Sequence, residues 1–587
     1  MKSPRVIATI LLLFNLTSAL AQISGSVNAD GAWNFKKGNN ENADVKLKYS
    51  GKNYYVGSGL NFGHSFLPSE QVTSILDAKK EKDEFFKGEF KTVDPRRFKA
   101  GAGLDFGYIF SPGQVLDAAV SYGFSGREES SLLETQRFNS GSDDILEGVQ
   151  NDTTFAMSHN IKFTAAYKQG LVSRPDARLG VNLDNITNLA VDANRRVTSG
   201  NFYSKAKNYA TYSSINDVDS DIKLYYDDVF RFAKSNLKMK AGLDFIFSQD
   251  FDLYFAENCV NGQWRDSTQY RQSYFYSSFT SEPYVNLTYN VWKLEFFVRE
   301  RVQLYKHAMI DKLEKVLPSG DVKPLFDRFD AKNLLSAGIT YRINDRNTVA
   351  VDYGRSIARP DYQKLCPTLM IGKSEGEYFV GNPDLLPEVT DRINFSYTYS
   401  KGIFVTKIDV NYRDKKNTAE KVIDLEKSKD VTDPMVKTIF TWVNSKRQGS
   451  LGSRLDLKMN GRDVKAEIYA GLNYDTYWKN GKPDKNDFNY EIGTIVDVFL
   501  NETTKLSTSL AYISAKQSAY SRKGEDVLAN IRFSKTIIKG LDIYAELKDL
   551  VDKEIYEETW NAAGNYLKVS STNPMHRSAV LGIKYLF

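Results

Sequence analysis

The sequence has little of what usually stabilises a small secreted domain or builds a metal site. Its 587 residues include only 2 cysteines, 15 prolines and 4 histidines. Two cysteines are too few for a disulfide framework. We expect Cys259 and Cys366 to be unpaired, although an exported chain would permit a bond between them. The histidines are isolated and follow none of the common zinc spacings, so neither a metal nor another cofactor is predicted.

Long apolar runs and strong charge are also missing. No segment offers about eighteen consecutive apolar residues, the least that a transmembrane helix needs. The formal net charge of +5 gives no strongly basic surface, so nucleic acid is not expected as a partner. Aromatic residues are abundant instead, with 35 Tyr and 35 Phe, while the mean hydropathy is −0.44. A membrane β-barrel combines these features, because half of each strand faces a wet lumen and its loops are polar.

Residues 1–21 are predicted to be a secretory signal peptide. Lys2 and Arg5 precede a mostly apolar run at 6–16, and Ala19-Leu20-Ala21 is a small-x-small cleavage site. The remaining residues, 22–587, are predicted to form one outer-membrane β-barrel domain without further division. The expected location is therefore the bacterial outer membrane, with lipid and the barrel assembly machinery as partners.

Alternation of apolar and polar residues predicts antiparallel strands along the whole chain. The clearest hairpin has Leu335, Ala337, Ile339 and Tyr341 on one face, a turn at 344–347, and a return strand that alternates through 349–353. One apolar and one polar face suit a strand with lipid outside and water inside.

Short turns and longer polar connections follow one another along the chain, and they set the number of strands. The short turns, expected at the periplasmic end, include 50–53, 111–113, 291–293, 400–402, 460–462, 501–504 and 539–540. The long connections, expected outside the cell, include 65–94, 138–151, 259–269, 308–331, 360–391 and 480–487. Counting from Ile23 predicts an all-β fold, a transmembrane antiparallel barrel of about 22 strands, with two of them between 178 and 230.

The C-terminus ends in a strand with aromatic residues at alternate positions. Gly582, Tyr585 and Phe587 fit the Gly-x-x-aromatic-x-aromatic pattern, which resembles the assembly signal of outer-membrane barrels; Val580 stands where that signal usually has a polar residue. We expect this strand to pair with the strand near 23–35, because closure removes both sheet edges. A buried C-terminal strand of a soluble β-sandwich is the alternative for these residues alone.

Two motifs in the middle of the chain resemble the barrel of TonB-dependent outer-membrane receptors, most closely the barrel family common in Bacteroidetes. The residues that carry the resemblance are Arg359, Pro360 and Tyr362, followed by Gly381, Asn382, Pro383, Pro387 and Glu388. In that family the first motif runs from a strand to the cell surface, and the second leads back into the next strand. The prolines cannot donate to a strand ladder, so we expect this stretch to shape a surface loop rather than to contact a ligand.

The resemblance implies nutrient uptake across the outer membrane, with one departure. Such receptors normally carry a plug domain before the barrel, whereas residues 23–35 already have the pattern of a strand, so no plug is expected in this sequence. Energy-coupled transport is then expected only if the gene model is truncated or the plug is a separate chain. A barrel this wide would then need occlusion by loops such as 65–94 and 308–331, or by a partner such as a separate plug or surface lipoprotein. A non-transporting surface scaffold that anchors a partner protein is the alternative function.

No enzymatic activity is predicted. The sequence has no Gly-x-Ser-x-Gly elbow before a helix, although an outer-membrane hydrolase with a surface Ser/His or Asp/His pair is a further alternative. Asp217, Asp219 and Asp221 have calcium-like spacing but lack the Gly and Glu of a calcium loop, which favours a solvated acidic strand.

The lumen wall is the place where a solute would act. Arg299, Arg301 and Gln303 are predicted to face inward. A cluster of aromatic residues on the preceding strand could stack on a ligand or form an interfacial girdle, and we favour the girdle. The cluster consists of Tyr270, Tyr274, Phe275, Tyr276, Phe279 and Tyr284.

Overall fold

A computed structural model describes most of the chain from residue 23 onward. The described ranges are 23–34, 38–66, 72–79, 84–111, 113–139, 146–171, 174–199, 208–232, 235–260, 263–266, 272–311, 324–367, 369–371, 377–424, 438–444, 447–479, 482–517, 521–553, 555–560, 566–572 and 577–586. The predicted signal peptide at 1–21 lies outside them, as does Phe587.

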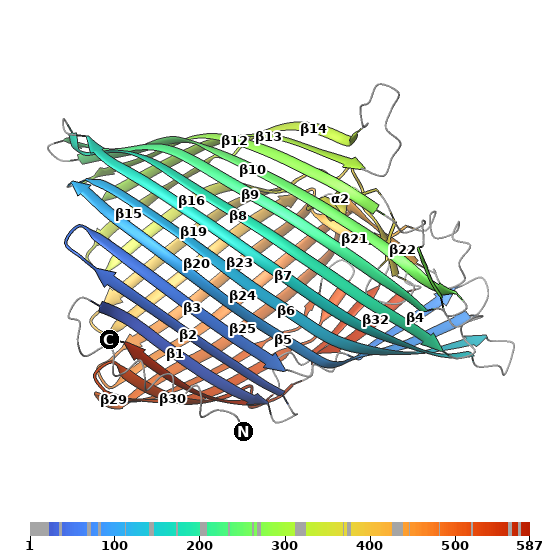
Figure 1. Ribbon diagram of the computed structural model, residues 1–587. Coiled ribbons are helices and arrows are strands. Elements are labelled where there is room, and N and C mark those ends of the chain that lie inside the picture. The colour runs from blue at the N-terminus through green and yellow to red at the C-terminus, as the bar shows by residue number, and fades with distance from the viewer. Residues whose placement is uncertain are drawn as a thin grey trace.

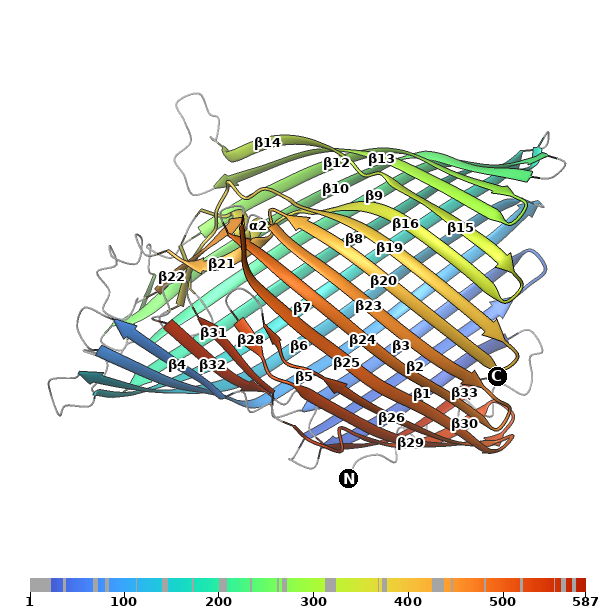
Figure 2. The same ribbon diagram turned by 180° about the vertical axis from the view of Figure 1, so that it is seen from behind.

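Twenty-two strands form one closed antiparallel barrel (Figures 1 and 2). In barrel order they are β1 (Ile23–Asn34), β2 (Gly38–Ser50), β3 (Tyr54–Phe66), β5 (Glu84–Ser111), β6 (Gln114–Asn139), β7 (Leu146–Leu171), β8 (Arg174–Ser199), β9 (Asn208–Phe232), β10 (Ser235–Val260), β12 (Gln272–Val291), β13 (Leu294–Asp311), β15 (Ser336–Asn344), β16 (Asn347–Ala358), β19 (Glu388–Lys401), β20 (Phe404–Lys416), β23 (Arg447–Asn460), β24 (Val464–Lys479), β25 (Lys482–Asn501), β26 (Thr504–Ile513), β29 (Asp526–Ile538), β30 (Leu541–Lys548) and β33 (Ser578–Leu586). The predicted count is confirmed, including the two strands between 178 and 230.

The barrel closes between its first and last strands. β33 pairs antiparallel with β1 from Ser26↔Leu586 to Asn34↔Ser578, and its other edge pairs with β30. This confirms the predicted closure, so neither terminal strand leaves an open edge in the membrane.

The outward face of the wall is apolar and exposed. Alternate residues such as Leu60, Phe62, Leu104 and Phe106 point outward, and Leu60 is 62% exposed. Residues between them face the lumen and are mostly small or polar. This alternation is the pattern that lipid outside and water inside require. Among the described residues, no helix has the length and hydropathy needed to cross a membrane.

Short turns gather at the end of the barrel where the C-terminal strand finishes, and long connections gather at the other end (Figure 1). The turns at Gly402 and Gly540 adopt positive φ, +58° and +86°. Several strands continue much further toward the loop end than predicted. For example, β5 begins at Glu84 and β25 at Lys482, inside segments expected to be connections.

Near the closure of the barrel, where the wall strands are short, a ribbon of additional strands extends the wall at the loop end. β4 (Val72–Lys79) pairs with the outer half of β5 and with β32 (Tyr566–Thr572), and β32 pairs with β31 (Ile555–Trp560). Three short strands complete the extensions at this rim: β11 (Gln263–Asp266) beside β10, β27 (Lys516–Gln517), and β28 (Ser521–Lys523) between β27 and β31. β14 (Pro324–Asn333) similarly extends the wall beside β13.

Two loops fold into a small sheet of their own at the loop end (Figure 2). Its strands are β17 (Leu369–Ile371), β18 (Glu377–Val380), β22 (Thr438–Asn444) and β21 (Ala419–Ile423), in that order. The pairing of β18 with β22 is parallel and joins the loop after β16 to the loop after β20. One helical turn, α2 (Tyr362–Leu365), precedes β17. We call α2, this sheet and the intervening segments 359–387 and 417–444 the loop platform, meaning their described residues throughout.

The loops that form the platform are not those that were expected to occlude the barrel. The described parts of 65–94 and 308–331 belong to the wall and its extensions. The loops that fold against the barrel instead follow β16 and β20, and the first of them carries the two family-like motifs.

Candidate functional site

Three neighbouring strands present one continuous inward face beneath the loop platform. On β13 the inward residues are Arg301, Gln303, Tyr305, His307 and Met309. Tyr284 and Tyr276 on β12 lie opposite Arg301 and Met309, while Asp330 and Phe326 on β14 lie opposite Tyr305 and Met309. Chemical character changes along this face, from charged near the middle of the strands to aromatic and then apolar near the rim.

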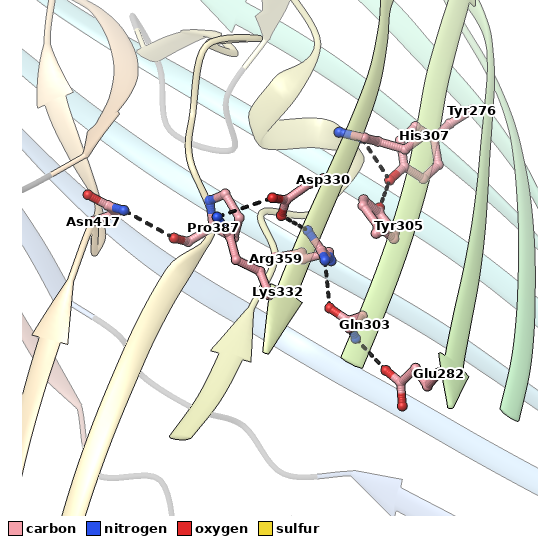
Figure 3. Close-up of polar contacts among 10 residues, drawn as sticks. All are labelled: Tyr276, Glu282, Gln303, Tyr305, His307, Asp330, Lys332, Arg359, Pro387 and Asn417. Carbon is pink, nitrogen blue, oxygen red and sulfur yellow. Dashed lines mark hydrogen bonds and ion pairs between the residues drawn. The ribbon is translucent and has the colours of Figure 1, made fainter. Parts of the chain in front are cut away.

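Arg359 joins the loop platform to this face (Figure 3). It follows β16 directly, and its guanidinium donates to Asp330 Oδ2 at 3.0 Å and to Gln303 Oε1 at 2.5 Å. The guanidinium carbon also lies 3.7 Å from the centre of the Tyr305 ring. Only 16% of the side chain is exposed. The three partners hold the first residue of the loop on β13 and β14.

The lower part of the face is a buried ionic cluster. Glu282 is only 3% exposed, and its carboxylate accepts from Arg301 Nη1 at 2.8 Å and from the Gln303 amide. Gln303 therefore bridges Glu282 and Arg359, as Figure 3 shows. Pairing of this kind satisfies charges that would be costly to bury alone.

The middle part of the face is aromatic. The Tyr276 and Tyr305 hydroxyls are 2.6 Å apart, and Tyr276 Oη lies 3.4 Å from His307 Nδ1. The His307 ring stands between Tyr305 and Phe326, with ring centres 4.8 and 5.2 Å away.

An apolar core lies above these aromatic residues and joins wall to platform. Tyr274, Tyr276, Met309 and Phe326 come from the wall, and Leu365, Cys366 and Leu385 come from the loop after β16. Trp442 and Ala419 from the loop after β20 pack against the same core. Both loops are therefore folded onto the barrel by burial of apolar side chains.

The Gly381-Asn382-Pro383 turn locks the platform internally. The Gly381 amide donates to the Cys366 carbonyl at 2.7 Å, and a Cβ at Gly381 would lie 2.3 Å from that oxygen. The Asn382 amide donates to the Lys364 carbonyl at 2.7 Å, and its side chain donates to the Trp442 carbonyl at 2.9 Å. Only glycine fits this close backbone approach.

The end of the second motif is held by the neighbouring loop. Asn444 makes a two-way contact with Leu386, accepting its amide at 2.8 Å and donating to its carbonyl at 2.9 Å. The Pro387 carbonyl accepts from Asn417 Nδ2 at 3.4 Å, and Glu388 pairs with Lys415 Nζ at 3.1 Å. The motif residues thus connect the platform to β19 and β20.

Glu420 of β21 is the carboxyl of the platform whose pKa is shifted. Burial raises its pKa above the ordinary value, because the charged form loses hydration in the loop sheet. The platform therefore contains one acidic group that is easier to protonate than a carboxyl in water.

The C-terminal assembly residues lie on the closing strand. Gly582 is covered by the Tyr544 ring of β30, whose atoms come within 2.2 Å of a Cβ built at Gly582. Tyr585 pairs with Val27 and Leu541. These positions fit a closing strand, while the role of Gly582 and Tyr585 as an assembly signal stays a prediction.

The structure brings most of the sequence-predicted motif residues together, where they hold the loop platform in place. Arg359, Gly381, Asn382, Pro387 and Glu388 all contact the platform or the wall as described. Pro383 lies inside the same turn, and Pro360 and Tyr362 lie at the start of the first loop; the side chain of Tyr362 is outside the described residues. The wall partners Glu282 and Asp330, and the loop partners Asn417 and Asn444, were not predicted.

The aromatic cluster on β12 is not a simple girdle. Tyr274, Tyr276 and Tyr284 face inward and are 3–6% exposed, whereas Phe279 faces outward and is 44% exposed. Tyr270 is outside the described residues. The alternation of the strand separates the residues that hold the platform from those that face lipid.

The remaining candidates lie apart from this site. Asp217, Asp219 and Asp221 belong to β9, and in the described part of the chain no three His, Cys, Asp or Glu residues gather as a metal site would require. Cys366 is buried in the platform core, and the Cys259 side chain is outside the described residues.

Several solved outer-membrane proteins have a similar fold. The copper transporter OprC has a TM-score of 0.63 and 11% identity, covering 96% of this chain and 81% of that one. The siderophore receptor PiuA from Acinetobacter baumannii has a TM-score of 0.62 and 10% identity, covering 96% and 82%. The ferripyoverdine receptor of the outer membrane of Pseudomonas aeruginosa, bound to ferripyoverdine, has a TM-score of 0.61 and 12% identity, covering 97% and 72%.

Identities this low show a shared fold, and no curated protein matches the sequence. The family comparison is stronger, because the outer membrane protein beta-barrel family matches residues 173–585. With its closed 22-strand wall and apolar outer face, the protein is an integral outer-membrane barrel like those of TonB-dependent receptors. The chain belongs to the outer membrane protein beta-barrel family.

Proposed function

We propose that the barrel mediates or supports uptake of a nutrient across the outer membrane, with the loop platform controlling access to the lumen. The observation that carries the proposal is the attachment of the platform to the inner face of β12–β14 through Arg359 and the shared apolar core. A closed barrel with polar inward residues offers a path for a polar solute, and a packed platform at its outer mouth narrows that path.

The similar solved structures support this proposal. They are siderophore receptors and a copper transporter, all of them proteins that bind or carry nutrients. The similarity extends only to the fold, so it does not indicate which nutrient this barrel takes.

The full chain in liposomes provides the test. We expect an uncharged probe of modest size, such as raffinose, to enter protein-containing liposomes faster than protein-free ones. In planar bilayers, the chain should show small or intermittent conductance, since the platform narrows the mouth. A permanently open, large-conductance pore would contradict control by the platform, and a complete lack of solute flux would contradict uptake by the chain alone.

A separate plug or surface lipoprotein is the partner that we propose for this barrel, and the barrel assembly machinery is the proposed route of insertion. Purification from outer membranes in mild detergent tests the first of these. A stable partner whose addition restores flux to an inactive chain would support assisted uptake. A stable partner without any flux would instead favour a surface scaffold.

A further inference from the structure

A hollow of about 780 Å³ lies on the inner face of the wall, away from the platform contacts. Two adjacent rows of residues line it across six strands. The upper row is Asn40, Ser65, Arg97, Arg127, Ala156 and Asp192, and the lower row is Asn42, Gly63, Lys99, Ser125, Ser158 and Ala190. Each residue is the direct cross-strand partner of the next, so their side chains share one face.

This face is the lumen side of the wall. Phe98 lies between Arg97 and Lys99 on β5, and its strand face is the one that carries Leu104 and Phe106 outward. Because successive side chains alternate, Arg97 and Lys99 point to the opposite side, into the barrel.

The two rows concentrate positive charge. Arg97 and Arg127 are direct cross-strand partners, and Lys99 lies two residues from Arg97 on the same face. Like charges directly opposite each other destabilise a strand pair. Across the described ranges, no carboxylate lies within ion-pair distance of Arg97 or Lys99. The only carboxylate in the two rows is Asp192, which Ala156 separates from Arg127.

Arg127 has hydrogen-bonding capacity left over. Its Nε lies 3.7 Å from Glu129 Oε2, too far for a good hydrogen bond, and this buried atom has no hydrogen-bond partner among the described residues. A buried donor without an acceptor is costly. The Arg127 side chain is 31% exposed, so a small rotation of its guanidinium would let it donate to an acceptor in the hollow.

Neutral donors and small residues complete the hollow. The Ser125 and Ser158 hydroxyls are 2.6 Å apart, and Ser125 is the direct cross-strand partner of Lys99. Asn42, at the far end of that row, donates its amide to Asp30 Oδ1 at 3.0 Å. Ala156 and Ala190 have small side chains on the same face, and the Lys99 side chain lies over Gly63. Hydroxyl groups can donate to oxygens that a guanidinium does not reach.

The hollow lies near the point where β5 exchanges one neighbouring strand for another. β5 pairs with β3 up to Arg96↔Phe66, and from Phe90 outward it pairs with β4 instead. The β5–β6 register shifts between Val93 and Arg96. Such irregularities re-aim neighbouring side chains and are frequent beside functional sites. A solute entering from the loop end would meet this row below the rim ribbon.

We propose that this basic basin, formed by Arg97, Lys99 and Arg127 with Ser125 and Ser158, binds the oxyanion groups of a compact anionic solute. The shared chemistry is a carboxylate or phosphate group that accepts paired guanidinium hydrogen bonds, and two or more such groups match three cations in adjacent rows. This deepens the proposed uptake function, on which it rests, by naming the substrate class.

Isothermal titration of the purified full chain in detergent, with citrate and with pyrophosphate as probes, tests the basin. We expect at least one probe to bind, with an affinity that weakens as NaCl is added. The double variant R97Q/K99Q should lose at least about tenfold in affinity, which corresponds to the loss of roughly one charged hydrogen bond. Binding of citrate alone would assign carboxylates, binding of pyrophosphate alone would assign phosphates, and binding of both would assign either group.

The matched control is K238Q/R299Q, which removes the same charge from inward positions on β10 and β13, outside the two rows. It should bind within about twofold of the unchanged chain. The basin is overturned if neither probe binds, or if both double variants bind as the unchanged chain does. Equal losses in the two variants would also overturn it, since they would reflect overall charge.

A raffinose flux assay separates failure of the basin from failure of uptake. Raffinose flux without any anion binding would overturn the basin and leave uptake standing. Anion binding that R97Q/K99Q abolishes, in liposomes that pass neither raffinose nor the bound anion, would overturn uptake by the chain alone and leave the basin standing.

Discussion

The Arg359 guanidinium lies over the Tyr305 ring, with 3.7 Å between its central carbon and the ring centre. Arg359 is the first residue after β16, and Tyr305 faces inward from β13. The contact therefore joins the start of a surface loop to a wall strand that β15 separates from β16. Because Asp330 and Gln303 bind the same guanidinium, the loop position depends on three wall residues at once.

Arg359→Ala should release the loop platform while leaving the barrel intact. Breaking a buried ion pair costs about 3–5 kcal/mol, and the lower end is expected here because part of the side chain is exposed. Hydrogen exchange of the amides in β17, β18, β21 and β22 should quicken by roughly a hundredfold at about 3 kcal/mol. Mass spectrometry of the exchanged protein measures this directly.

Arg355→Ala is the matched control for that variant. Arg355 lies four residues earlier, and its bond to Asp391 at 2.7 Å is on the surface of the wall, away from the platform. Platform exchange in this variant should stay close to that of the unchanged protein. Equal exchange in both variants would show that Arg359 does not hold the loop.

Gly381→Ala should also loosen the platform, for a different reason. The added Cβ would lie 2.3 Å from the Cys366 carbonyl oxygen and 2.6 Å from its nitrogen, and both are backbone atoms. Relief of such a clash typically costs about 1–3 kcal/mol. Limited proteolysis should cut segments 359–387 faster, whereas Gly471→Ala, where the nearest atom is 3.9 Å away, should behave like the unchanged chain.

The architecture could be predicted from the sequence because a membrane barrel repeats a local rule. Each strand must be apolar on one face, as at Leu335, Ile339 and Val351, and each short turn carries its own residue signature. The strand number and the pairing of β1 with β33 followed from these rules alone. The outer lengths of β5 and β25 did not, because strand beyond the membrane edge no longer needs an apolar outer face.

The partners in the site could not be predicted because they depend on long-range register. Arg359 is separated from Gln303 by 56 residues and from Asp330 by 29, and no local pattern links them. Alternation did predict that Arg301 and Gln303 face inward. Alternation could not show that Tyr274 and Tyr276, on the neighbouring strand β12, would be covered by a loop rather than exposed at the membrane boundary.

Glu420 should make the platform more stable at acidic pH. Its native pKa is raised by burial, whereas in the undocked loop it returns to an ordinary value near 4.3. The docked state therefore binds more protons between these two pKa values, and its stability falls as pH rises through that window. Above the native pKa the penalty is fully present.

Glu420→Gln should remove that penalty. Exchange of the β21 and β22 amides, compared at equal intrinsic exchange rates, should be slower in the variant than in the unchanged chain at pH 7.5. The difference should shrink at pH 4.5. The same substitution at the exposed Glu502, in the turn after β25, should alter neither value; a pH dependence that survives Glu420→Gln would assign it to another group.

Closure of the barrel predicts a specific covalent link between its first and last strands. Ala29 and Ile583 are direct partners in the β1–β33 register. Directly opposed residues in an antiparallel pair have Cα atoms about 4.5–5.5 Å apart, within the range that a disulfide spans. The variant A29C/I583C should therefore form a bond on mild oxidation, and mass spectrometry of the digested protein should identify the cross-linked peptide. The control A29C/L581C shifts one cysteine by two residues on the same face, to a diagonal position about 7–8 Å away, so it should cross-link poorly. Cross-linking of the control but not of the first pair would place the two strands in a different register, and no cross-link in either would contradict closure through β1 and β33.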